Sequence, residues 1–188
     1  MNDSAYAVRV SEDTVRIERT LPGPIERVWA YLTESDKRRQ WLASGDMTLR
    51  VGEPVELLFR HAELSEAPGD PPPRFEAMKE GHLNTGHITA CEPPRLLAYT
   101  WGENHGDPSA VRFELVERGH AVLLTVIHTR LDGRDTMRSV AGGWHTHLDI
   151  LADRMHGRVS PDFWTAYTKL EREYAVRLDT NAPSGLLR

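Results

Sequence analysis

The stretch that decides the fold is AGGWHTHLDILADRM, residues 141–155. Its apolar side chains Trp144, Leu148, Leu151 and Met155 recur at intervals of three and four residues. That spacing puts them on one helix face, so we predict an amphipathic helix over residues 143–155. Gly157 follows it as a typical helix stop.

Strand-like stretches fill the chain ahead of this helix. Four of them, residues 86–92, 96–101, 111–117 and 121–129, follow one another with connections rich in turn-forming residues. Sequential strands joined in this way pair antiparallel. Three more lie upstream, at residues 14–21, 47–51 and 54–60. We therefore predict an α+β domain in which a curved antiparallel sheet of six to seven strands wraps around the long C-terminal helix.

Further segments complete this plan. Helical spacing is present at residues 24–32 and 35–41, and Ser160-Pro161-Asp162 is a start signal for an extra helix over residues 160–178. The Pro-rich residues 62–80 are expected to form an exposed, mobile insertion. This gives an N-terminal tail (1–13), a core domain (14–156), and an extra helix with its tail (157–188), of which residues 181–188 are expected to fray.

Composition excludes several classes of protein. The 188 residues carry a formal net charge of −5 with a pI near 6.0, which argues against a nucleic-acid partner. The basic run at residues 37–39 is interpreted as a solvated helix face. The single cysteine, Cys91, can form no internal disulfide, and no apolar run is long enough for a membrane span. We expect a cytoplasmic protein, and only three lysines among 23 cations suggest a bacterial source.

Motifs for cofactors or covalent catalysis are not found in the sequence. His145 and His147 are two residues apart on a helix, so their side chains diverge and cannot chelate one metal ion together. The glycine spacing of residues 81–86 lacks the Lys-Ser/Thr pair of a phosphate-binding loop. Gly142 and Gly143 are expected to let the chain turn sharply ahead of the long helix and to let that helix approach the sheet closely. The alternative is that residues 141–143 present free backbone N–H groups to an anionic ligand. We therefore expect no metal and no cofactor, and we assign no catalytic residue.

Three stretches resemble a known family. PIERVWAYLT with the following QWL (residues 24–42), GHITACEPPRLLAYTW (86–101) and AGGWHTHLDIL (141–151) resemble the opening helix pair, central hairpin and C-terminal helix of the activator of heat shock protein 90 kDa ATPase homologue-like family. That family belongs to the START-related (SRPBCC) superfamily, with the polyketide cyclases and birch-pollen-allergen-like proteins. The resemblance implies a helix-grip fold with a cavity between the sheet and the long helix.

Aromatic and histidine side chains form the candidate ligand site. Alternation along the strands directs one set of them toward the face of the long helix, where they fill a core or line a partly open apolar pocket. The candidate ligand-binding residues are Phe59, His61, His87, Tyr99, Trp101, Phe113, Thr125, His128, Trp144, His147, Leu148 and Leu151.

Three functions stay open at this stage. The first is a binding protein that holds a small hydrophobic or aromatic ligand in this cavity, with a homodimer left open. The second is an enzyme similar to polyketide cyclases, dehydratases or hydrolases, with a cavity histidine as acid–base. The third is a co-chaperone-like interaction module, which would present an exposed apolar patch on the last helix.

Overall fold

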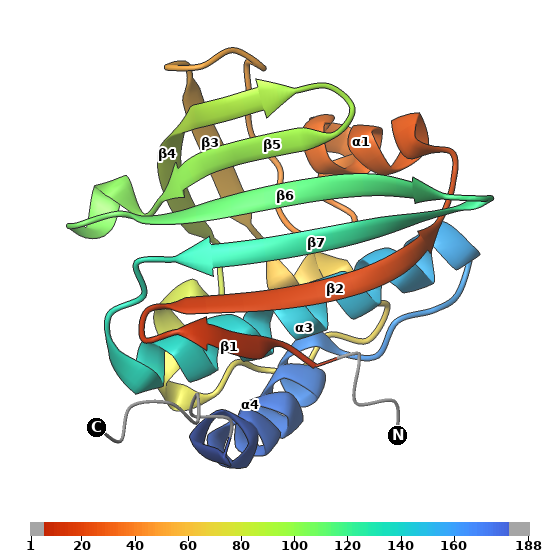
Figure 1. Ribbon diagram of the computed structural model, residues 1–188. Coiled ribbons are helices and arrows are strands. Elements are labelled where there is room, and N and C mark those ends of the chain that lie inside the picture. Colours follow the sequence, from red (N-terminus) through yellow and green to blue (C-terminus); the bar gives the residue numbers. More distant parts are fainter. Residues whose placement is uncertain (1–5, 181–188) are drawn as a thin grey trace.

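A seven-stranded antiparallel sheet forms the body of the protein in the computed structural model, which describes residues 6–180 (Figure 1). Its strand order is β1-β2-β7-β6-β5-β4-β3. The strands are β1 (Val8–Ser11), β2 (Thr14–Pro22), β3 (Pro54–Phe59), β4 (His82–Glu92), β5 (Leu96–Trp101), β6 (Ser109–Arg118) and β7 (Ala121–Thr129). The predicted α+β helix-grip fold is confirmed, since one face of the curved sheet packs on a long helix.

Within residues 6–180, four α-helices and three short 3₁₀ helices, η2 to η4, accompany the sheet. They are α1 (Ile25–Thr33), α2 (Ser35–Arg38), α3 (Gly133–His156), α4 (Phe163–Thr180), η2 (His61–Leu64), η3 (Pro73–Met78) and η4 (Glu103–His105). Helix α3 lies behind the sheet and α4 packs against α3 (Figure 1). Within residues 6–180, no helix combines the length and the apolar character that crossing a bilayer requires.

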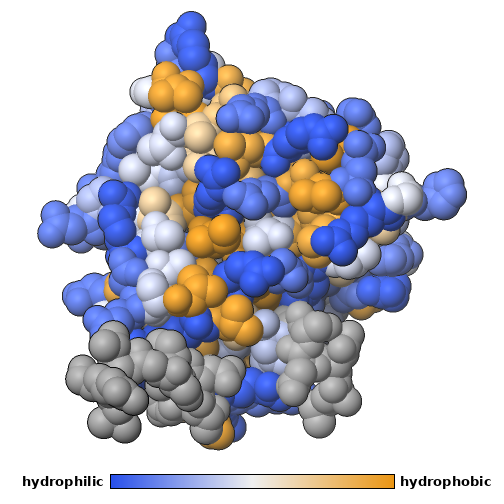
Figure 2. All heavy atoms as spheres, viewed as in Figure 1, coloured by the Kyte–Doolittle hydropathy of each residue, from blue (hydrophilic) through white to orange (hydrophobic). Residues whose placement is uncertain are grey.

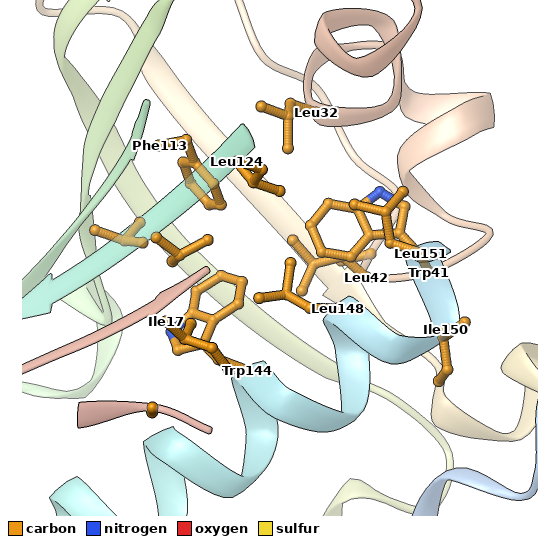
Figure 3. Packing of buried hydrophobic residues seen from close by; sticks show 14 of the residues in the cluster. Ile17, Leu32, Trp41, Leu42, Phe113, Leu124, Trp144, Leu148, Ile150 and Leu151 are labelled. Carbon is orange, nitrogen blue, oxygen red and sulfur yellow. The ribbon is translucent and has the colours of Figure 1, made fainter. Parts of the chain in front are cut away.

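Helix α3 closes the main core with the face that the sequence pattern predicts. Figure 3 shows Trp144 and Leu148 pointing toward Phe113 and Leu124 of the sheet. These side chains are buried, and full burial of one such side chain contributes about 1.5–3 kcal/mol. The apolar stripe of α3 therefore anchors the helix in the curve of the sheet.

Helix α3 begins ten residues earlier than predicted, at Gly133. Gly142 and Gly143 consequently lie inside the helix, so the prediction that the chain turns sharply at them is wrong, and their N–H groups are not at a helix start. A Cβ atom added at Gly142 would lie 3.4 Å from Cε2 of Tyr167, so this glycine permits close approach of α4 rather than of the sheet.

The segment between α2 and β3 differs from the prediction in two ways. Residues 48–53 form turns, in which the Arg50 N–H donates to the Thr48 carbonyl oxygen (2.7 Å), and a cation is buried at the end of α2. Arg38 is fully buried, and its guanidinium donates hydrogen bonds to the carbonyl oxygens of Thr33 (2.8 Å), Ala43 (3.2 Å) and Gly45 (2.6 Å). The side chain thus satisfies backbone groups that a longer helix or a strand would have paired. The predicted strand at 47–51 is wrong, the predicted helix at 35–41 is shorter, and Arg38 is not on a solvated face.

The Pro-rich segment 62–80 is folded against α4. The Gly69 N–H donates to Oδ1 of Asp162 across 2.7 Å, and Arg74 forms an ion pair with Glu171. Phe75 stacks on Trp164 with a centroid distance of 5.4 Å. These contacts hold η3 against α4. Most residues of the segment are exposed, as expected, and its mobility stays a prediction.

The predicted N-terminal tail contains the edge strand β1. The buried N–H of Ala7 donates to the Tyr174 hydroxyl (2.7 Å), and that hydroxyl lies 2.9 Å from Nδ1 of His145. This chain of contacts ties the start of the described chain to α3 and α4. The expected fraying of 181–188 concerns residues outside those that the structure describes.

The outer face of the sheet is mixed in character. Figure 2 shows apolar side chains between charged ones over this face. The charged residues include the same-strand ion pairs Arg16–Glu18 and Arg112–Glu114. The contrast with the apolar inner face follows from the two-residue period of the strands.

Candidate functional site

A cavity of about 170 Å³ lies where the concave face of the sheet, α3, α4 and the packed 62–80 segment meet. Its walls are mostly aromatic and aliphatic. The lining residues are Leu42, Phe59, His61, Phe75, Met78, Trp101, His128, Ser139, Val140, Gly143, Trp144, His147, Phe163, Trp164 and Tyr167.

Helix α3 supplies one wall through residues spaced three and four apart. Ser139, Val140, Gly143, Trp144 and His147 lie on successive turns of one helix face. A Cβ atom built on Gly143 would meet nothing within 4 Å. The missing side chain of Gly143 therefore leaves space in the cavity that any larger residue would occupy.

Helix α4 and η3 form the opposite wall. Phe163 and Trp164 begin α4, and Phe75 stacks on Trp164. Tyr167 donates its O–H to Glu171 (3.0 Å), so the Ser139 hydroxyl, 2.9 Å from the Tyr167 oxygen, acts as the donor in that pair. The hydroxyl protons of Ser139, on α3, and Tyr167, on α4, therefore both have acceptors within the protein.

His128 is fully engaged by the protein. The indole N–H of Trp144 donates to its Nδ1 (2.9 Å), which must then be unprotonated, because an indole nitrogen can only donate. Its Nε2 carries the proton and donates to the Ser109 hydroxyl (2.7 Å). Burial lowers the pKa of His128 to about 3, so the ring is neutral at neutral pH and has no free nitrogen for a ligand.

His147 is held by one nitrogen only. Its Nδ1 lies 2.7 Å from the carbonyl oxygen of Trp41, and because a carbonyl only accepts, Nδ1 carries the proton. Burial lowers the pKa of His147 to about 4, although this hydrogen bond acts in the opposite direction. In the neutral ring Nε2 is therefore a hydrogen-bond acceptor, and it has no partner among residues 6–180.

His61 has no hydrogen-bond partner in the described part of the chain. Its Nδ1 is completely buried, and the ring lies 4.1 Å from Phe163 and 4.7 Å from Trp164, measured between centroids. Burial, with smaller contributions from His147 and His82, lowers the pKa of His61 to about 3. A neutral imidazole thus lies in an aromatic cage with its hydrogen-bonding capacity unused.

Metal chelation is not supported by this arrangement. No group of three or more His, Cys, Asp or Glu residues close enough to hold a metal ion occurs within residues 6–180. His145 bonds to Tyr174 on the α4 side while His147 faces the cavity, as the helical spacing predicts.

One family model matches most of the chain. The family model described as "Activator of Hsp90 ATPase homolog 1-like protein" matches residues 22–156. The chain belongs to this family. No match was found among curated proteins.

Several solved structures are similar to this chain in fold. A Bordetella parapertussis protein studied by solution NMR is 45% identical, with 91% of this chain and 89% of that one covered and a TM-score of 0.76. CalU16 from Micromonospora echinospora is 23% identical over 86% of this chain and 85% of its own, with a TM-score of 0.62. DynU16, from the dynemicin biosynthetic locus, is 20% identical over 82% and 51%, also with a TM-score of 0.62. The likenesses to CalU16 and DynU16 support the helix-grip fold alone.

The Hsp90-activator-like match ends at residue 156, before α4. Three cavity residues, Phe163, Trp164 and Tyr167, therefore come from a helix that the family model does not cover. The part of the site that this helix builds is a feature of the chain beyond its family core.

The structure separates the twelve predicted site residues into three groups. Six line the cavity: Phe59, His61, Trp101, His128, Trp144 and His147. Four are packed in the core outside the lining: Tyr99, Phe113, Leu148 and Leu151. The remaining two, His87 and Thr125, lie on the outer face, where His87 pairs with Glu103 and the Thr125 hydroxyl is 3.4 Å from Glu18.

Strand alternation explains the two residues on the outer face. On β4 the inward positions are Asn84, Gly86 and Ile88, so the side chain of His87 points to the outer face. On β7 Thr125 is three residues from the inward-pointing His128, so the two side chains point to opposite faces of the sheet. Applying this period to each strand would have removed both residues from the candidate list.

Nine lining residues were missed in the sequence analysis. They are Leu42, Phe75, Met78, Ser139, Val140, Gly143, Phe163, Trp164 and Tyr167. Helical spacing would have indicated Val140, four residues before Trp144, and Gly143, four residues before His147. No comparable local signal brings α4 and the 62–80 segment to the cavity, because both arrive through tertiary packing.

Proposed function

We propose that this protein binds a small, neutral, aromatic molecule in the cavity between the sheet, α3 and α4. The observation that carries the proposal is the cavity itself, with its aromatic lining and two imidazoles that have unused hydrogen-bonding atoms. Concave apolar sites with a few placed polar groups are the usual form of a small-molecule site.

The volume of the cavity limits the size of the ligand. An engineered apolar cavity of about 150 Å³ binds benzene, whereas pockets for drug-sized ligands have about 300–1,000 Å³. At 170 Å³ the present cavity matches a single ring with small substituents. A long acyl chain or a polycyclic product would require the walls to move.

The charge of the cavity favours a neutral ligand. No lining residue within the described range is a lysine, arginine, aspartate or glutamate. Because burial keeps the pKa values of His61, His128 and His147 at about 3 to 4, these rings carry no charge at neutral pH. A charged ligand would lose its hydration without gaining a partner of opposite charge.

Thermal unfolding with small compounds tests the proposal. Toluene and phenol at about 100 times their dissociation constants should raise Tm by roughly 5–10 °C, since binding to the folded state alone stabilises it. Benzoate, which is charged, and decanol, which is longer than the cavity, should have little effect. If neither toluene nor phenol raises Tm up to its solubility limit, the proposal is wrong.

The enzymatic alternative has one observation in its favour. The Trp41 carbonyl orients His147 so that Nε2 is left free, which is the arrangement that a general base requires. A pKa near 4 nevertheless makes His147 a weak base at neutral pH. A reaction that depends on His147 would have a pH–rate profile with an inflection near pH 4.

The interaction-module alternative needs an apolar patch on the last helix, and the described side chains of α4 do not form one. The large apolar residues Phe163, Trp164, Tyr167 and Tyr174 of α4 are buried. Among the described positions of α4, Val176 is the large aliphatic residue that is left exposed. We therefore rank a co-chaperone-like role below ligand binding.

A further inference from the structure

We propose that the ligand carries a hydroxyl group on its ring and that His147 and His61 together bind that hydroxyl. This inference rests on the proposed function and narrows it from any small neutral ring to a phenol-like compound. It depends on which ring nitrogens the protein leaves unused, a property that the hydrogen bonds around each histidine determine.

His147 specifies a hydrogen-bond donor on the ligand. Because its Nδ1–H is given to the Trp41 carbonyl, the nitrogen left unused is a lone-pair acceptor. The position of that carbonyl is itself fixed, since the Trp41 indole N–H donates to the Tyr31 carbonyl oxygen (2.8 Å) and Arg38 bonds the flanking segment. A ligand with only an acceptor would gain nothing from His147.

His61 adds a second requirement. A neutral imidazole has one N–H and one lone pair, and neither has a partner within residues 6–180. Because Nδ1 is completely buried, Nε2 is the His61 nitrogen that a ligand can reach. The His61 and His147 rings lie 5.6 Å apart between centroids. A hydroxyl is one atom that both donates and accepts, so it can donate to His147 while it accepts from the N–H of His61.

The other polar groups of the cavity do not compete for the ligand's hydroxyl. Both nitrogens of His128 are occupied by Trp144 and Ser109. The Ser139 hydroxyl donates to Tyr167, whose own proton goes to Glu171. The two unpartnered imidazoles are thus the polar groups of the lining that remain for a ligand.

Isothermal titration of wild-type protein with three ring compounds of similar size tests the inference. Phenol donates and accepts, anisole only accepts, and toluene does neither. We expect phenol to bind about tenfold more tightly than either of the others, the factor that corresponds to one net hydrogen bond. Equal affinities for phenol and anisole would overturn the inference and leave the proposed function standing. Failure of all three to bind would overturn both.

Variants assign the preference to the two histidines. His147→Phe and His61→Phe should each bring the affinity for phenol close to that for toluene while toluene still binds. Met78→Leu, a lining change of similar volume without a polar atom, should keep the preference. A preference for phenol that survives both histidine substitutions would contradict the inference.

A ¹⁵N NMR measurement on the wild-type protein tests the inference even where the variants fail to fold. In wild-type protein the ¹⁵N resonance of His147 Nε2 should move upfield on addition of phenol, because its lone pair then accepts a hydrogen bond. Toluene should leave that resonance in place. An Nε2 resonance that does not respond to saturating phenol would rule out His147 as the acceptor.

Discussion

The indole N–H of Trp144 donates a buried hydrogen bond of 2.9 Å to Nδ1 of His128. The bond joins the long helix to the central sheet, and it fixes the His128 tautomer so that Nε2–H reaches Ser109. One of the three histidines that line the cavity is therefore part of the framework, which separates it in role from His61 and His147.

A double-mutant cycle measures the Trp144–His128 bond. His128→Phe leaves the buried indole N–H without a partner and should lower the free energy of unfolding by about 1–3 kcal/mol. His128→Phe combined with Trp144→Phe should cost less than the sum of the two single changes, because neither buried group is then orphaned. Additive losses in urea denaturation would show that the bond contributes little.

The buried histidines make stability depend on pH. Burial lowers the pKa of His61, His128 and His145 to about 3, and that of His147 to about 4, against about 6.5 in the unfolded chain. Below pH 6.5 the unfolded chain binds more protons than the folded one. The free energy of unfolding therefore contains the full contribution of these histidines above pH 6.5 and falls as the pH decreases toward 4.

The slope of that dependence is measurable. Each such histidine contributes up to about 1.4 kcal/mol per pH unit between the two pKa values. Urea denaturation at pH 7.5, 6.0 and 5.0 should show the decrease, and His145→Gln should reduce the slope. His156→Gln, at an exposed position, serves as the control and should not. Stability that is constant from pH 7.5 to 5.0 would contradict the neutral state of these rings.

Arg38 should contribute far more to stability than its neighbour Arg39. Arg38→Met leaves three carbonyl oxygens without their guanidinium donors and should cost at least about 2 kcal/mol. Arg39, whose side chain is largely exposed and pairs with Glu63, provides the matched control, and Arg39→Met should change stability by under about 1 kcal/mol. Similar losses for both, by chemical denaturation, would refute the role assigned to Arg38.

The adjacent glycines of α3 should respond in opposite directions. Gly143→Leu adds a good helix former with its Cβ in open space, and replacing glycine in a helix gains about 0.8 kcal/mol, so Tm should rise. Gly142→Leu forces α4 away at Tyr167 and should cost about 1–3 kcal/mol. Equal effects on Tm would show that the two positions do not differ in this way.

Periodic sequence signals predicted most of the framework. The apolar spacing after residue 143 indicated α3, and alternation with short connections indicated β5, β6 and β7, because these elements bury one regular face. The predicted strand at 47–51 failed for a physical reason. Met47 forms an isolated bridge with Val55, but the N–H groups of Arg50 and Glu53 donate to the carbonyl oxygens of Thr48 and Arg50, so the backbone turns over residues 48–53 instead of pairing with a strand.

The site was predicted only in part because its walls come from distant segments. Trp101, Trp144 and His147 followed from strand and helix faces. Phe75 and Trp164 are 89 residues apart in the chain and meet only because the 62–80 segment packs on α4. Which ring nitrogen of His147 carries the proton depends likewise on one distant partner, the Trp41 carbonyl oxygen, which is 106 residues away in the chain.

Intermolecular nuclear Overhauser effects from bound phenol test the central claim most directly. If the ring occupies the cavity, its protons should show contacts with the indole protons of Trp101 and Trp144 in wild-type protein. The same contacts should vanish in Gly143→Leu, which fills the cavity while the protein stays folded. Contacts confined to surface residues, or contacts that persist unchanged in Gly143→Leu, would contradict binding at this site.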